Sequence, residues 1–274
     1  MYFKFIIFVI AFTLARSDDL DCECGIGQGK GKTRIVNGNT VALNTYPWMV
    51  ALMNTDTGRQ FCGGTLINDR WILTAAHCVP DLTPDKLLVI ASTVSLDKVY
   101  QENALQVDYI WSNPSYLGKT DYHHNDIALL RLSNPVKFSN KLSPICLPSA
   151  NQIDFDNLFY MGWGKVGVGK QASNDLLYID TMPSDDCYRV FYPGFEKDKQ
   201  FCTQAEGKGI CDGDSGGPLS SKVNGHVTQV GINSYVALGT CGEKPDVTTR
   251  VSAFLDDIYS VTDGSNWCRN PNKD

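Results

Sequence analysis

The sequence predicts an all-β protein built as two closely packed barrels, and three observations support this fold class. From residue 35 onward, short runs rich in Val, Ile, Tyr and Trp alternate with turn signals such as Asn113-Pro114 and Asn224-Gly225, which is typical of β-strands joined by tight turns. Helical patterns are few. The chain has 274 residues, of which 43% are hydrophobic, so it can bury a large core, and two packed barrels commonly fill this length as one unit. The strand pattern alone fits a β-sandwich as well.

The first 17 residues are typical of an export signal. Lys4 precedes an apolar run over residues 5–14, and Ala15 and Ser17 supply the small residues that a signal peptidase requires. A membrane anchor is the alternative, but this run spans only about 15 Å as a helix, half of a hydrocarbon layer of about 30 Å. We therefore expect a secreted, extracellular protein without a membrane partner.

The chain then divides into a short polar segment and one main domain. Residues 18–34 combine acidic side chains with glycines and cations, a composition expected of a linker or propeptide. The main domain covers residues 35–274. Within it we expect one helical turn at 75–78, a short helix at 184–191 and a terminal amphipathic helix at 251–261. The apolar face of the terminal helix carries Val251, Phe254, Leu255 and Ile258.

The charge balance and the cysteines limit the possible functions. The formal net charge is −6 and no cluster of Lys and Arg is present, so we expect no nucleic-acid partner. Ten cysteines in an exported chain predict disulfides, because that compartment is oxidising. A zinc site is the alternative, but the chain has no Cys-x-x-Cys pair. We expect no metal and no cofactor.

The clearest chemical signal is the segment Gly-Asp-Ser-Gly-Gly-Pro at residues 213–218, where Ser215 lies among glycines that allow a sharp turn. On its own the segment also fits an ordinary glycine-rich turn. A serine hydroxyl needs a base to accept its proton and a third group to orient that base. His77 is the candidate base, although its run at residues 73–78, Leu-Thr-Ala-Ala-His-Cys, would fit a buried structural histidine equally well.

The other histidines are weaker candidates. His123 and His124 lie beside polar residues and are expected to be solvated loop histidines, and His226 follows a turn. Asp126 immediately precedes the apolar run 127–130. A carboxylate at this point either caps a turn or orients an imidazole from the edge of the core.

Together, three segments resemble the chymotrypsin/trypsin family of serine proteases: Thr-Ala-Ala-His-Cys at 74–78, Asp-Ile-Ala-Leu-Leu at 126–130 and the glycine-rich segment at 213–218. The likeness covers essentially all of residues 35–261. It implies two packed six-stranded antiparallel Greek-key barrels with a C-terminal helix. The order His, Asp, Ser contradicts an α/β-hydrolase, in which the order is Ser, Asp, His.

The resemblance implies a role for each residue of the site. Ser215 attacks the peptide carbonyl, His77 transfers the proton and Asp126 orients His77. The backbone amides of Gly213 and Ser215 form the oxyanion hole, and Ser234 donates a hydrogen bond to Asp126. The implied activity is that of a serine-type endopeptidase, a monomer with protein or peptide substrates and protein inhibitors as partners. A non-catalytic homologue with a binding or regulatory role is the alternative.

The resemblance also implies that a trypsin-like protease activates the chain by cutting between Arg34 and Ile35. The new Ile35 amine would pair with Asp214 and order the oxyanion loop, since a buried ion needs a partner. Five cysteine pairs are implied as well. They are Cys62–Cys78, Cys187–Cys202, Cys211–Cys241, a bond from Cys24 or Cys22 to Cys146, and a bond from the other of these two to Cys268.

The specificity pocket departs from the best-known members of the family. Gly209 lies at its floor, where trypsin-like members have an aspartate, and Val236 narrows its wall. Asp246 in the wall would attract a basic side chain by a charge-assisted hydrogen bond. We expect a chymotrypsin- or elastase-like preference for small to medium apolar residues, with mixed specificity that includes Arg and Lys as the alternative. The implied pocket residues are Gly209, Ile210, Asp212, Ser234, Tyr235, Val236 and Asp246.

Overall fold

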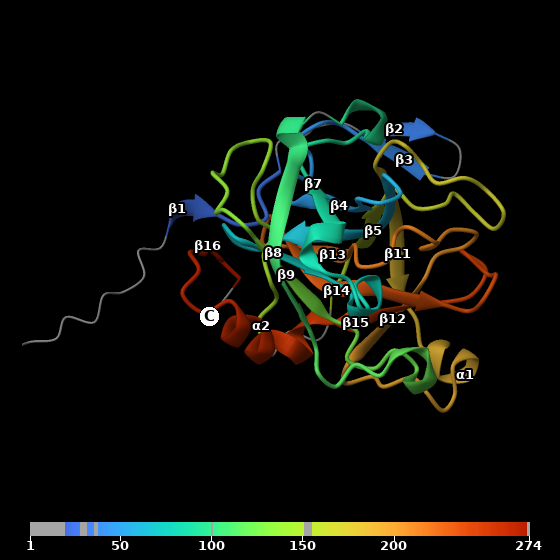
Figure 1. Ribbon diagram of the computed structural model, residues 1–274. Helices are drawn as coiled ribbons and strands as arrows, with labels where there is room; N and C mark the ends of the chain where they lie inside the picture. Colours follow the sequence, from blue (N-terminus) through green and yellow to red (C-terminus); the bar gives the residue numbers. More distant parts are fainter. Residues whose placement is uncertain (1–19, 28–31, 36–37, 100, 151–154, 273–274) are drawn as a thin grey trace, which may run out of the picture.

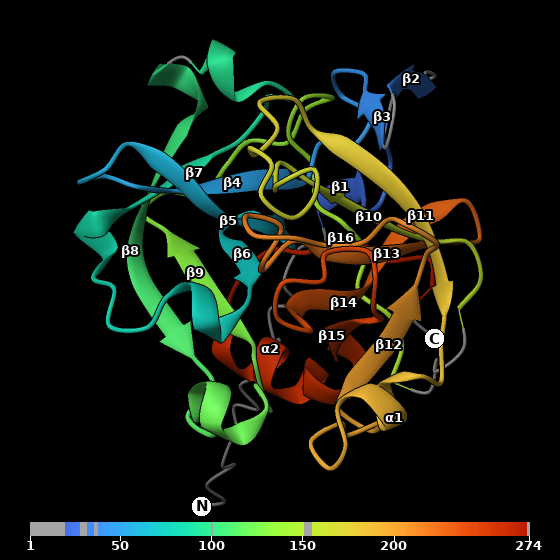
Figure 2. The same ribbon diagram turned by 90° about the vertical axis from the view of Figure 1, so that its right-hand side faces the viewer.

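The computed structural model describes residues 20–27, 32–35, 38–99, 101–150 and 155–272, and it confirms the predicted all-β architecture (Figures 1 and 2). Six antiparallel strands close the first barrel in the order β4-β5-β6-β9-β8-β7. These strands are β4 (Met49–Asn54), β5 (Arg59–Leu66), β6 (Trp71–Thr74), β7 (Leu87–Ile90), β8 (Ala104–Ser112) and β9 (Ala128–Leu132).

The second barrel has six antiparallel strands in the order β10-β13-β14-β15-β12-β11, and pairing of β10 with β11 closes it. Strands β3 (Gly38–Val41) and β2 (Lys32–Ile35) extend this sheet from β11, so that β2 is the last strand in the order. The barrel strands are β10 (Leu158–Gly162), β11 (Leu177–Pro183), β12 (Gln200–Gln204), β13 (Pro218–Val223), β14 (His226–Val236) and β15 (Asp246–Arg250).

Apolar side chains fill the first barrel and join it to the second. Ile72 and Leu73 on β6 point to opposite faces of the strand, and both are fully buried, so this strand is covered on both sides. The core around them continues to Phe159 and Trp163 of the second barrel and to Ile258 in the C-terminal helix. A smaller cluster fills the second barrel and contains Phe155, Leu158, Tyr160, Phe201, Ile210, Leu219 and Val230.

The helical segments lie close to where the sequence predicts them. The terminal one begins as the 3-10 turn η6 (Val251–Phe254) and continues as α2 (Leu255–Val261). Its predicted apolar face is buried: Val251, Phe254, Leu255 and Ile258 are all under 9% exposed.

Two shorter helical predictions refer to residues 75–78 and 184–191. The first corresponds to η1 (Ala76–Cys78) and the second to α1 (Cys187–Val190). Helix α1 begins later than predicted because Ser184 still donates a backbone hydrogen bond to Cys202 of β12. The remaining 3-10 turns are η2 (Pro84–Lys86), η3 (Leu96–Lys98), η4 (Gln101–Asn103) and η5 (Gly118–Asp121).

The beginning and the end of the described chain lie side by side. Strand β1 (Leu20–Glu23) pairs in parallel with β16 (Cys268–Arg269), as Figure 1 shows beside α2. The proposed export signal at residues 1–17 lies outside the described residues. Within the described ranges, no helix is both long enough and apolar enough to cross a bilayer.

Candidate active site

The register of two neighbouring strands brings His77 and Asp126 together. Thr74 at the end of β6 pairs with Ala128 at the start of β9. Because the two strands are antiparallel, the residues after Thr74 and those before Ala128 leave the barrel at the same end of the strand pair. There the backbone amide of His77 donates to Oδ1 of Asp126 over 2.8 Å, and Nδ1 of His77 lies 2.7 Å from Oδ2.

The carboxylate of Asp126 is fully buried but well supplied with donors. The hydroxyl of Ser234 donates to Oδ2 over 2.5 Å, in addition to the two bonds from His77. Burial alone would raise the pKa of Asp126, but the charge of His77 and these hydrogen bonds outweigh it and lower the pKa below its ordinary value. The group can therefore remain charged and hold the imidazole in one orientation.

Ser215 lies in a tight turn that is fixed between the two barrels. Gly213 and Gly216 on either side of it have positive φ angles of 97° and 75°, which glycine adopts without strain. The amide of Gly63 in β5 donates to the Ser215 carbonyl over 2.7 Å, and the amide of Gly216 donates to Asn233 in β14 over 2.8 Å. The turn is thus attached to both barrels.

Ser215 and His77 line the same cleft, which also contains Ser234 and has a volume of about 1070 Å³. Within the described part of the chain, no hydrogen bond joins the Ser215 hydroxyl to His77. Such bonds are often long before a substrate closes the site. Because Asp126 engages Nδ1 of His77, Nε2 is the nitrogen left for the serine proton.

Two backbone amides beside the Ser215 hydroxyl are available as hydrogen-bond donors. Among the described residues, the amides of Gly213 and Ser215 have no hydrogen-bond acceptor, as an oxyanion hole requires. The Gln60 side chain fixes the loop beside them, since its Nε2 donates to the carbonyls of Gly213 over 2.8 Å and of Cys62 over 3.0 Å. No sequence signal distinguished Gln60 from other polar residues.

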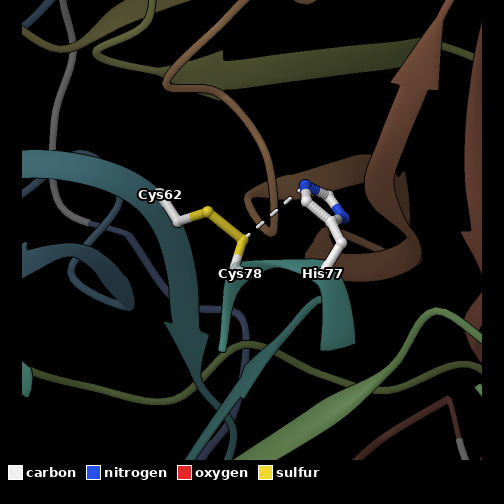
Figure 3. Close-up of side chains that lie close together, drawn as sticks. All are labelled: Cys62, His77 and Cys78. Carbon is white, nitrogen blue, oxygen red and sulfur yellow. Dashed lines mark hydrogen bonds between the residues drawn. A yellow bond between two sulfur atoms is a disulfide. The ribbon is translucent and has the colours of Figure 1, made fainter. Parts of the chain in front are cut away.

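A disulfide holds the short η1 turn that carries His77 (Figure 3). Cys78 is bonded to Cys62 in β5, and its Sγ lies 3.9 Å from Nε2 of His77. Both sulfurs are used in this bond, so these two cysteines cannot act as thiolate ligands for a metal next to His77.

The prediction that His123 and His124 are solvated is wrong. His123 is buried, with Nδ1 3.8 Å from Oδ2 of Asp126 and 3.0 Å from the Tyr116 hydroxyl. Burial lowers the pKa of His123, although the charge of Asp126 opposes the shift. The half-buried His124 instead contacts the Gly194 carbonyl through Nε2 over 2.8 Å. Polar neighbours in the sequence did not reveal that this loop folds back onto the second barrel.

Asp246 lies beside Gly209, the residue that the resemblance implies at the floor of the specificity pocket. A Cβ atom placed on Gly209 would lie 2.8 Å from Oδ2 and 2.9 Å from Oδ1 of Asp246. Asp246 Oδ2 accepts a hydrogen bond from the Ile210 amide over 3.3 Å, whereas Oδ1 has no partner in the described part of the chain. Burial is the largest cause that raises the pKa of Asp246 to about 8.

The other implied pocket residues line the cleft. Tyr235 and Val236 are among its lining residues, together with Ile210 and Asp212. The charge of Asp212 is offset, because the ammonium group of Lys165 lies 2.7 Å from its carboxylate. Asp212 therefore adds less negative potential to the pocket mouth than its sequence position suggests.

The implied activation site lies on β2, where the backbone of Arg34 pairs with Asn39 and that of Ile35 with Gly38. The side chains of Arg34 and Ile35 lie outside what the structure describes. Asp214 is buried elsewhere, beside a cavity of about 70 Å³, and accepts hydrogen bonds from the amides of Gly164 over 2.8 Å and Cys211 over 3.1 Å. Among the described residues no cation pairs with Asp214, and burial is the largest cause that raises its pKa to about 6.

All ten cysteines form disulfides in the structure. Cys24 is bonded to Cys146 and Cys22 to Cys268, so the structure distinguishes the two pairings that the sequence left open. The other three bonds are Cys62–Cys78, Cys187–Cys202 and Cys211–Cys241.

Known proteins share this sequence pattern over most of the chain. The family model described as Trypsin matches residues 35–258. The chain is 30% identical over 248 residues to Venom serine protease 34 of Apis mellifera, in a region that is 86% of this chain and 60% of the bee protein. The chain therefore spans less than two thirds of that relative. It is 33% identical over 242 residues to Tryptase of Mus musculus, covering 82% of this chain and 87% of the mouse protein. The chain belongs to the trypsin family of serine proteases.

Proposed function

We propose that this chain is a secreted serine endopeptidase, made as a precursor and activated by cleavage after Arg34. The observation that carries the proposal is the shared cleft of Ser215 and His77, in which the imidazole is held by the buried carboxylate of Asp126. A serine, a base and an orienting carboxylate are the groups that acyl transfer requires.

The reaction follows from the roles of these groups. Nε2 of His77 accepts the hydroxyl proton as Ser215 Oγ bonds to the peptide carbonyl carbon. The carbonyl oxygen becomes an oxyanion, and the free amides of Gly213 and Ser215 stabilise it, with each such donor lowering the barrier by roughly 3 to 4 kcal/mol. The protonated His77 then gives its proton to the leaving amine. A water molecule repeats these steps on the acyl-enzyme and restores Ser215.

Activation requires a new charge next to the oxyanion loop. Cleavage after Arg34 creates an ammonium group on Ile35, and the buried Asp214 is a carboxylate that has no cation among the described residues. A buried charge is stable only when an opposite charge pairs with it. Stabilisation of the turn at residues 213–215 by this pair is the proposed switch from precursor to enzyme.

The proposed specificity is for small to medium apolar side chains near neutral pH, with Arg and Lys accepted when Asp246 is ionised. The buried position of Asp246 next to Gly209 supports this proposal. Peptide-library profiling of the activated protein at several pH values would define the preference.

An organophosphate active-site reagent tests the main proposal. We expect it to label Ser215 in the chain cut after Arg34, to label the uncut chain far more slowly, and not to label Ser215→Ala. Labelling is measured by the mass increase of the peptide that contains residue 215. A correctly cut and folded chain that stays unlabelled would instead be a non-catalytic homologue with a binding role.

A further inference from the structure

His123 lies directly against the catalytic pair, although its place in the sequence does not suggest this. Its ring meets the His77 ring edge-on, with centroids 5.5 Å apart at 81°, and stacks on Tyr235 with centroids 5.4 Å apart. The loop reaches this position because Tyr122, His123 and Asn125 all have left-handed backbone conformations, with φ angles of 49°, 54° and 58°. Contacts to Asp126, His77, Tyr235 and Tyr116 therefore fix the imidazole.

The distances between the donor atoms of His77, His123 and Asp126 approach those between the ligands of a metal ion. In the described part of the chain, one donor atom from each of His77, His123 and Asp126 lies within 4.8 Å of the other two. Tetrahedral zinc with bonds of 2.0 to 2.2 Å holds neighbouring donors about 3.3 Å apart. Oδ2 of Asp126 is 2.7 Å from Nδ1 of His77 and 3.8 Å from Nδ1 of His123, so the two distances bracket this value. The donors of His77 and His123 lie within 4.8 Å of each other, so movements of up to about 1.5 Å of the two imidazoles would produce a three-ligand site.

We propose that His77, His123 and Asp126 form an inhibitory site for a divalent transition-metal ion, best suited to Zn²⁺. Two imidazoles and one carboxylate with an open fourth position are a ligand set that zinc binds, whereas calcium and magnesium require more oxygen ligands. Both imidazoles line the large cleft, while Asp126 is fully buried behind them. The ion therefore enters from the cleft, between the two rings.

Binding at this site blocks catalysis by changing the tautomer of His77. The ion takes the place of the proton between Nδ1 of His77 and Asp126, and the neutral imidazole then carries its proton on Nε2. An Nε2 atom that already carries a proton cannot accept the proton of Ser215. The specificity pocket stays open, so the ion lowers kcat more than it raises KM.

One existing contact opposes metal binding and provides a test. The Tyr116 hydroxyl lies 3.0 Å from Nδ1 of His123, the atom that faces Asp126. Zinc has to displace this hydrogen bond. Tyr116→Phe removes the competing group and is expected to strengthen zinc binding, whereas His123→Gln removes a ligand and is expected to weaken it.

The experiment titrates zinc chloride into the activated wild-type protein and three variants while kcat and KM are measured. We expect reversible inhibition of the wild type that EDTA relieves, and no inhibition by calcium or magnesium. His123→Gln should raise the half-inhibitory zinc concentration by at least about tenfold, and Tyr116→Phe should lower it. His124→Gln is the matched control, because this neighbouring side chain contacts Gly194 instead, and it should behave like the wild type.

A second measurement separates this site from the proposed peptidase activity on which the inhibition assay rests. Co²⁺ is added to the Ser215→Ala protein, and the visible absorption bands of four-coordinate cobalt are expected with His123 present and lost in His123→Gln. This readout needs no catalysis. Equal zinc inhibition of the wild type and His123→Gln, or cobalt bands that persist without His123, would overturn the metal site even if the chain is a peptidase.

Discussion

At the scale of single residues, Asp246 lies beside Gly209 at the proposed floor of the specificity pocket, and neither residue is among those that line the large cleft. Gly209 has no side chain at this position, and the Asp246 carboxylate oxygens lie 2.8 and 2.9 Å from where a Cβ would be. Burial is the largest cause that raises the pKa of Asp246 to about 8; the Ile210 amide opposes this shift and the charge of Asp214 adds to it. With this pKa the carboxyl is mostly neutral at neutral pH, and the proposed pocket is then expected to favour apolar side chains.

The first prediction follows from this pKa. The raised pKa means that Asp246 is protonated below about pH 8 and ionised above it. We expect the ratio of kcat/KM for an Arg substrate to that for a Leu substrate to rise from pH 6 to 8, by up to about tenfold per pH unit, and to level off above pH 8. Titration of any group in the catalytic machinery shared by both substrates cancels in the ratio.

Asp246→Asn is the control for this measurement, because it keeps the shape of the side chain without the charge. Its ratio should be low and independent of pH. A ratio that stays constant with pH in the wild type, or that rises equally in Asp246→Asn, would show that another group attracts the basic side chain.

At the scale of the elements, the sequence predicts regular structure well and irregular loops poorly. The apolar face at residues 251–261 was readable because helical spacing alone defines it, and the structure buries all four of its residues. His77 and Asp126 were recognised as a pair through the resemblance of their segments to a known family, and the antiparallel pairing of Thr74 with Ala128 shows how the fold brings them together.

The loop that carries His123 could not be predicted in this way. Left-handed conformations are unfavourable for bulky side chains, so neither Tyr122 nor His123 signals one. Tertiary contacts hold the loop instead: Nε2 of Gln200 in β12 donates to the Tyr122 carbonyl over 3.2 Å, and Tyr116 contacts His123. The contact between Gln200 and Tyr122 joins residues 78 positions apart and therefore leaves no local pattern.

The second prediction concerns the N-terminal element. β1 is attached to the body of the protein by two disulfides, Cys22–Cys268 and Cys24–Cys146. After cleavage at Arg34, either bond alone should keep the cut segment attached. We expect Cys22→Ser/Cys268→Ser and Cys24→Ser/Cys146→Ser each to retain it under non-reducing conditions, and only the fourfold variant to release it.

Mass spectrometry of the cut proteins without reductant checks this outcome. Each bond closes a long loop, of 246 and 122 residues in sequence separation, so its loss should lower the free energy of unfolding by roughly 2 to 5 kcal/mol. Release of the segment from either double variant would contradict the prediction, since one remaining bond would then be insufficient.

At the scale of the whole molecule, the proposed activation site and the proposed oxyanion loop would be connected through Asp214. Arg34 lies on β2, the last strand of its sheet order, which leaves one edge of the strand unpaired within the described sheet. Asp214 lies between Gly213 and Ser215 in sequence, and its carbonyl accepts a hydrogen bond from the Asn233 side chain over 2.9 Å. A new charge paired with Asp214 therefore acts directly on both amides of the proposed oxyanion hole.

The last prediction combines this activation site with the pocket. Because cleavage after Arg34 requires arginine in the specificity pocket, the mature protein should process its own precursor poorly while Asp246 is neutral. The substrate for the test is the Ser215→Ala precursor, which cannot cut itself, and the product with Ile35 at its N-terminus is followed by terminal sequencing. Added mature protein should cut it slowly at pH 6.5 and up to about tenfold faster per pH unit as Asp246 ionises towards pH 8.

Two comparisons make this result decisive. Trypsin should cut the same precursor at both pH values, which shows that the bond on β2 is accessible, and mature Asp246→Asn should cut it slowly at both. If the mature wild type cuts as fast at pH 6.5 as at pH 8, the neutral pocket does not exclude arginine. A separate activating protease is then unnecessary. In that case the buried Asp246 carboxyl loses its proton when the arginine cation binds, so the pocket accepts arginine at any pH.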